Sequence, residues 1–173
     1  AGPPLPRTLA RAPYPALRCW RYFSALLARS APTRSPRLPR QLERALSRYP
    51  GFLALHLQQA ALFSRLRDWT RAEAAARAAL RLDAWSAAAW HERSLARFSM
   101  KDPAAAYAYS ALGYFCEGRQ DTCRDLLRQR RQLLDRQGTP DPLPGLEDFL
   151  LVRFPARMSL HPLRWGMLDP ETL

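Results

Sequence analysis

The sequence has little glycine, almost no lysine and no long apolar run. Its seven glycines are scattered among 173 residues, and no GxGxxG, GxSxG or HExxH pattern occurs. The longest apolar stretches are broken by charge and fall short of the roughly 20 residues that span a bilayer. We therefore expect no transmembrane helix, no cofactor and no enzymatic activity.

Cysteine and histidine are also few. The sequence contains only Cys19, Cys116, Cys123, His56, His91 and His161. The cysteines lack CxxC spacing, which predicts neither a zinc site nor a disulfide framework and favours a reducing compartment. Cys116 and Cys123 flank a predicted helix turn, where buried and inert thiols are expected. The histidines are far apart in the sequence, so packing or surface roles are favoured over metal binding or catalysis.

The charge is strongly one-sided. The chain carries 27 basic and 15 acidic residues, a net charge of +12, and Lys101 is its only lysine. Residues 1–50 hold ten arginines and one acid, whereas residues 141–173 hold three arginines and five acids. An arginine-rich, acid-free beginning is typical of mitochondrial targeting regions. We expect a mitochondrial protein, on the matrix side, with a processed N-terminus; a simple basic tail is the alternative.

A repeat becomes visible when the chain is aligned with itself at an offset of 34 residues. Small residues, which allow two helices to approach closely, then recur at equivalent positions. The equivalent pairs are Ala60 and Ser94, Ala72 and Ala106, Ala79 and Gly113, and His56 and Trp90.

Residues 56–83 resemble the tetratricopeptide repeat (TPR) motif. The matching residues are Ala60, Phe63, Trp69, Ala72, Ala79 and Leu80. The departures are His56 at the first aromatic position, Gln59 at the following leucine and Ala84 at the closing proline. Residues 87–120 match less well and residues 19–52 weakly. The resemblance implies a fold and does not name an activity.

The expected fold is all-α, a TPR-like solenoid of seven to eight antiparallel helices with proline-rich ends. The predicted helices cover 14–29, 36–48, 52–66, 70–82, 86–100, 103–117 and 121–137, with a short one near 145–152. This gives a basic arm (1–13), a repeat domain (14–137) and a proline-rich extension (138–173). The repeat domain comprises repeats near 19–52, 53–86 and 87–120 and a capping helix over 121–137.

Local sequence signals support these boundaries. Thr70 and Glu73 have the spacing of a capping box, and Asp102 and Ser35 each precede a proline at a helix start. Gly138 predicts the end of the last helix. One face of that helix is expected to be buried: Cys123, Leu126, Leu127, Leu133 and Leu134. The opposite face is expected to carry ion pairs among Asp121, Asp125, Asp135, Arg124, Arg128, Arg130, Arg131 and Arg136.

The first functional hypothesis is a protein scaffold. The chain would be an accessory subunit of a respiratory-chain complex or of the ATP synthase, binding neighbours through its helical surface and arms. Its size and repeat type are similar to those of a pentatricopeptide-like, F1-associated subunit of euglenozoan ATP synthase. Aromatic anchors for neighbouring subunits would include Phe149, Phe154 and Trp165. Trp20, Tyr22 and Phe23 serve either as anchors or as core residues.

The second hypothesis is contact with RNA, as a mitochondrial ribosomal or other RNA-associated protein. Arginines that neutralise phosphates release counterions and add affinity without reading sequence. The candidate arginines are Arg7, Arg11, Arg18, Arg21, Arg34, Arg37 and Arg40. Two weaker alternatives are binding of acidic peptide tails through Gln59, Arg93 and Arg97, and contact of residues 17–29 with a membrane surface.

Overall fold

Seven α-helices account for most of the described chain. The computed structural model describes residues 14–29, 37–146 and 150, and these residues contain no strand. The helices are α1 (Tyr14–Arg29), α2 (Arg37–Arg48), α3 (Leu53–Arg65), α4 (Trp69–Leu82), α5 (Ala87–Ser99), α6 (Pro103–Cys116) and α7 (Gln120–Gln137). Their positions confirm the seven long predicted helices to within one residue at each end. The short helix near 145–152 lies partly outside the described residues, although Leu146 and Leu150 are helical.

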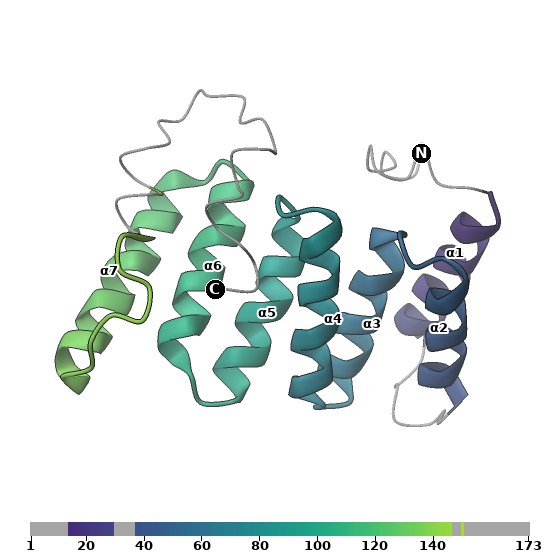
Figure 1. Ribbon diagram of the computed structural model, residues 1–173, viewed down its shortest axis with the longest axis horizontal. Coiled ribbons are helices and arrows are strands. Elements are labelled where there is room, and N and C mark those ends of the chain that lie inside the picture. The colour runs from purple at the N-terminus through teal and green to yellow at the C-terminus, as the bar shows by residue number, and fades with distance from the viewer. Residues whose placement is uncertain (1–13, 30–36, 147–149, 151–173) are drawn as a thin grey trace.

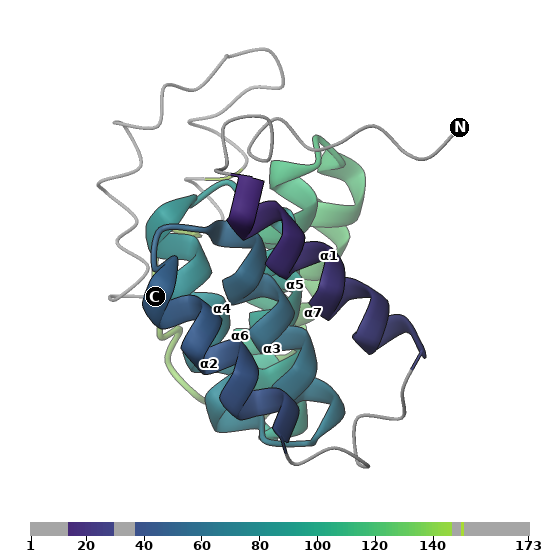
Figure 2. The same cartoon turned by 90° about the vertical axis from the view of Figure 1, so that its right-hand side faces the viewer.

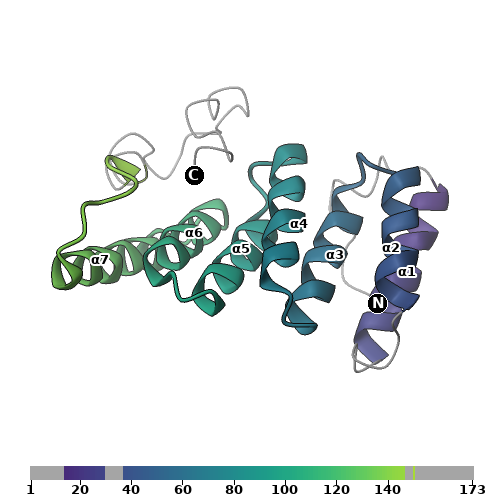
Figure 3. The ribbon, with the colours of Figure 1, turned by 60° about the horizontal axis from the view of Figure 1, so that its bottom comes forward.

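Consecutive helices pack side by side in a row (Figure 1). Helix α3 also contacts α1 and α5, while α2 and α4 both pack on α3. Figure 2 shows the row from its α1–α2 end, and Figure 3 shows α7 at the opposite end. The fold is therefore all-α with adjacent helices packed in pairs. None of the described helices is long and apolar enough to cross a membrane.

Three helix-to-helix turns share one geometry. In the α3–α4 turn Arg67 has a φ of 58°, and in the α5–α6 turn Lys101 has a φ of 64°. Gly118 occupies the same place between α6 and α7, with a φ of 77°. The backbone N–H after each of them donates to a carbonyl five residues earlier, as in a Schellman motif. Two of these left-handed positions thus hold a basic residue where glycine is favoured.

Aspartates begin two of the helices. Asp102 accepts a hydrogen bond from the Ala105 N–H at 3.2 Å, with Pro103 in the first helical turn, which confirms the predicted cap. The prediction of a capping box at Thr70 and Glu73 is wrong. Asp68 caps α4 instead, accepting from the Arg71 N–H at 3.2 Å, so the helix begins before Thr70. The Ser35 cap lies outside the described residues.

The core is divided at the contact between α3 and α4. One large cluster joins α1, α2 and α3 around Phe23, Leu42 and Leu62, and another joins α4 to α7 around Trp90 and Leu112, with Leu53 and Leu57 of α3 packed against its edge. Smaller clusters bridge the two, and one of them consists of alanines alone: Ala60, Ala75 and Ala76. Alanine lets the backbones of α3 and α4 approach closely but supplies no side-chain volume beyond that contact.

Helix α7 ends as predicted and differs from expectation on one face. Gly138 closes it in the left-handed conformation, and Cys123, Leu127 and Leu134 are buried. The predicted surface pairs Asp121–Arg124 and Asp125–Arg128 form at 3.8 and 3.4 Å. Arg130, however, is buried on the apolar face and pairs with Asp141, beyond the helix. The prediction that Arg130 lies on the exposed face was wrong, because its ion-pair partner, Asp141, comes after the helix in the chain and not within it.

Candidate protein-binding groove

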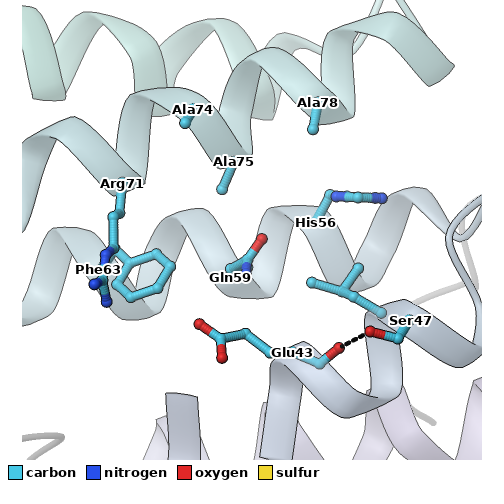
Figure 4. A pocket seen from close by; sticks show the side chains of 10 residues that line it. Glu43, Ser47, His56, Gln59, Phe63, Arg71, Ala74, Ala75 and Ala78 are labelled. Atoms are coloured by element: carbon cyan, nitrogen blue, oxygen red, sulfur yellow. Dashed lines mark hydrogen bonds between the residues drawn. The ribbon is translucent and has the colours of Figure 1, made fainter. Parts of the chain in front are cut away.

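An open groove of about 410 Å³ lies between α2 and α4, with α3 as its floor (Figure 4). Cavities that bind small ligands or peptide side chains have volumes of this order. The groove is lined by Glu43, Leu46, Ser47, His56, Gln59, Phe63, Arg71, Ala74, Ala75 and Ala78. Three of the four α4 residues in this lining are alanines, which explains why the space remains empty.

Polar groups of the groove are left without partners inside the described chain. The Gln59 amide forms no hydrogen bond with any described residue, and Figure 4 shows it in the middle of the groove. The Glu43 carboxylate forms no ion pair with the described residues, and Figure 4 shows it directed toward Phe63. His56 donates from Nε2 to the Pro50 carbonyl at 2.7 Å, so its buried Nδ1 is an acceptor that has no partner. The groove can therefore still donate and accept hydrogen bonds.

Phe63 and Arg71 close one end of the groove. The Arg71 guanidinium lies 5.5 Å from the Phe63 ring centroid, a cation–π distance, and 3.4 Å from Asp68. Phe63 is almost fully buried, while 65% of the Arg71 side chain is exposed. This end presents positive charge to solvent above an apolar floor.

Further arginines surround the same end. Arg37 and Arg40 are exposed in the first turn of α2, with Arg40 one turn before Glu43 on the same face. Arg67 is exposed in the α3–α4 turn. Because α2 starts where α3 ends, these residues share one edge of the helix row (Figure 1). With Arg71, four arginines lie there against two acidic groups, Asp68 and Glu43. We call this edge the basic mouth of the groove.

The equivalent space between α4 and α6 is filled. Residues 34 positions later than His56, Gln59 and Ala75 are Trp90, Arg93 and Tyr109, and all three are buried. The Trp90 and Tyr109 ring centroids lie 5.7 Å apart, and the Arg93 guanidinium lies 4.1 Å from the Tyr109 ring centroid. Arg93 also donates to the Tyr109 hydroxyl at 3.0 Å. Large side chains therefore occupy the volume that is open in the groove.

Glu73 provides the negative charge of this filled junction. It accepts from Arg97 Nε at 2.8 Å and lies 3.6 Å from both Arg77 and Arg93. Burial lowers the pKa of Arg93 from its ordinary value, and the nearby Glu73 charge opposes this. Burial alone would lower the pKa of Arg97 as well, but its hydrogen bond to Glu73 and the nearby charges of Glu73, Tyr109 and Asp102 together raise it. The cluster is a structural ion network joining α4, α5 and α6.

The candidate residues from the sequence fall into different environments. Arg18, Arg21, Arg37 and Arg40 are exposed, and Gln59 lines the groove. Arg93 is fully buried and Arg97 is engaged by Glu73 and Asp102, so neither belongs to the groove. The candidates outside the described residues are Arg7, Arg11, Arg34, Phe149, Phe154 and Trp165.

The alternatives for three aromatic residues are now resolved by their burial. Phe23 is a core residue and Trp20 packs against the same cluster, whereas 52% of Tyr22 is exposed. The groove residues Phe63, Glu43 and Ala75 were not expected to form a site. The available signal was the alanine at 75, where the next repeat carries a tyrosine.

The two described cysteines with placed side chains lie in apolar surroundings. Burial raises the pKa of Cys116 to about 12 and that of Cys123 to about 11, so both thiols stay protonated near neutral pH. Among the described residues, no three His, Cys, Asp or Glu side chains are placed to hold a metal ion.

Comparisons with known proteins add no identity. No protein-family model, curated protein or solved structure matches the chain. The groove, its charges and the repeat in the sequence are therefore the features of the chain that bear on its function.

Proposed function

We propose that the protein is a non-enzymatic scaffold, built as a TPR-like solenoid, that binds other proteins as an accessory subunit of a mitochondrial assembly. The respiratory chain and the ATP synthase are the assemblies that we favour, and the arginine-rich beginning of the chain supports the location. The observation that carries the binding role is the open groove, because the equivalent space one repeat later is filled.

Exposed apolar side chains support protein partners. Leu95 and Phe98 lie one turn apart on α5 and are 47% and 63% exposed. Large apolar residues of this kind contribute much of the binding energy at protein interfaces when they become buried. Together with Tyr22 on α1, they offer apolar contacts outside the groove.

Native purification tests this proposal most directly. The tagged full chain is purified from its source with and without ribonuclease, and co-migrating proteins are identified by mass spectrometry. Ribonuclease-resistant recovery with respiratory-chain or ATP synthase subunits is expected. Recovery of the chain alone, without any co-migrating protein, would contradict a scaffold role.

A specific observation favours a second candidate function, binding to RNA. Arg37, Arg40, Arg44 and Arg48 form an exposed stripe along α2, with helical spacing that places them on one side. Such a stripe can bind phosphates with a strong salt dependence. Recovery with ribosomal proteins that is lost on ribonuclease treatment would favour this function over the scaffold.

A further inference from the structure

We infer that the groove between α2, α3 and α4 binds an extended segment of a partner protein, in which acidic residues lie on one side of an apolar anchor residue. This inference rests on the proposed scaffold function and names its partner chemistry. The partner segment would lie on α3, between α2 and α4.

The apolar anchor follows from the walls of the groove. Leu46, Phe63 and Ala75 are almost fully buried within the protein and present their remaining surface to the empty space. The next repeat shows what such a space accepts, because Tyr109 occupies the position equivalent to Ala75. A leucine, phenylalanine or tyrosine of the partner would complete the groove as Tyr109 completes the filled junction.

An extended backbone follows from Gln59. Its side-chain amide has both a donor and an acceptor, and neither bonds to a described residue. The peptide groups of an extended segment have an N–H and a C=O still available, whereas those within a helix are already paired.

Acidic residues on one side follow from charge complementarity at the basic mouth. Arg37, Arg40, Arg67 and Arg71 lie there with only two carboxylates, Asp68 and Glu43, which leaves an excess of positive charge. The excess is smaller at the other end, where Arg48 and Arg81 are exposed in the last turns of α2 and α4 and Asp83 follows directly after α4. A partner therefore gains most by placing its acids toward the start of α2 and its anchor beyond Phe63.

The same charges disfavour a nucleic acid inside the groove. The Glu43 carboxylate projects into it without an ionic partner and would repel a phosphodiester chain. Bases bind single-stranded sites by stacking on aromatic faces, but Arg71 already covers the ring of Phe63. A peptide can place its negative charge only at the mouth and avoid Glu43.

Selection from a displayed library of short random peptides on the full-length protein tests the inference. We expect enriched sequences with a central large apolar residue and acids on one side of it. Fluorescein-labelled copies of these peptides are then titrated by anisotropy, with an oligouridylate as a second probe. Enrichment without acidic bias, or no enrichment at all, overturns the inference.

Variants locate the binding. Ala75→Tyr fills the groove, and Arg40→Glu reverses a charge at its mouth; each should weaken peptide binding at least about tenfold. The matched controls are Ala88→Tyr, at an exposed position of α5, and Arg136→Glu, at an exposed position of α7, and both should bind normally. Circular dichroism verifies folding, and Ala78→Leu, which copies Leu112 of the next repeat, replaces Ala75→Tyr if the latter does not fold.

The remaining outcomes separate this inference from the scaffold function. Peptide binding that survives both Ala75→Tyr and Ala78→Leu overturns the groove assignment. Oligouridylate binding that is lost in these variants, without peptide enrichment, overturns it in favour of RNA. If no peptide binds but the native complex is still recovered, the scaffold function stands and another surface makes the contact.

Discussion

Two junctions of this molecule share one framework and differ in what fills it. In the first, α2 and α4 pack on α3; in the second, α4 and α6 pack on α5. His56 donates to the carbonyl of Pro50 at 2.7 Å, and Trp90, its equivalent, donates to that of Ala84 at 2.9 Å. The first junction nevertheless contains an open groove, whereas the second is closed by Trp90, Arg93 and Tyr109.

This difference shows that helix placement and groove filling depend on different residues. The backbone frame is maintained by small residues at helix contacts, by left-handed turns and by aspartate caps, which recur in both junctions. The large side chains between the even-numbered helices vary independently of that frame. One junction can therefore stay open while the other stabilises the fold.

Opening the filled junction should have the largest effect. Tyr109 is 1% exposed, and Tyr109→Ala removes its ring from Trp90 and its hydroxyl from Arg93. We expect the free energy of unfolding to fall by about 4 kcal/mol, the usual loss for a large buried aromatic residue. Urea denaturation measures it. Tyr22→Ala, at an exposed site, should lose less than about 1 kcal/mol; equal losses would show that Tyr109 does not fill the junction.

Removing the acid of the filled junction should have the next largest effect. Glu73→Ala leaves Arg93 fully buried without its carboxylate and brings Arg77 and Arg97 into uncompensated repulsion. We expect a loss of about 3 kcal/mol, because an unpaired buried charge is costly. Glu43→Ala in the open junction should change stability by less than about 0.5 kcal/mol. Similar values for both variants would refute the distinction between a structural and an available carboxylate.

The sequence predicted the positions of the helices better than the side chains that fill the space between them. Helix positions followed from apolar periodicity, from the Asp102–Pro103 cap and from Gly138, all of which act locally. The recurrence of Ala72 and Ala106 predicted close helix contacts, and both are buried. A local signal failed at the start of α4: Asp68 and Thr70 compete to cap the helix, and the spacing to Glu73 favoured the wrong residue.

The groove could not be predicted from local pattern, because it depends on side chains from three helices. The sequence singled out Gln59 only as a candidate for binding acidic peptide tails. Arg93 was named for the same role, although it is fully buried. An arginine in a helix favours an exposed position unless a carboxylate is nearby. Glu73 lies on the preceding helix, and Asp141, which pairs with Arg130, lies beyond α7, so neither partner was visible in the spacing.

The turns of the two junctions should respond alike to substitution. Arg67 and Lys101 both adopt left-handed φ values, a conformation that is unfavourable for residues with a Cβ. Arg67→Gly and Lys101→Gly should each raise the free energy of unfolding by about 0.5 to 1 kcal/mol, after the larger unfolded-state entropy of glycine is included. Thermal denaturation measures both, and Gly118→Ala should show the opposite sign. A stabilisation in only one of the turns would mean that the two frames are not equivalent.

Filling the open junction should have the smallest effect on stability. Ala75 is 4% exposed and borders the groove, so the ring in Ala75→Tyr has empty volume to occupy. We expect the free energy of unfolding, measured by urea denaturation, to change by less than about 1 kcal/mol, because the new apolar burial offsets small packing strain. Its neighbour Ala76 is 0% exposed and packs with Ala60, so Ala76→Tyr should lose about 3 kcal/mol through overpacking. If both tyrosines destabilise the protein equally, the space beside Ala75 does not accept a side chain, and the two junctions differ in something other than filling.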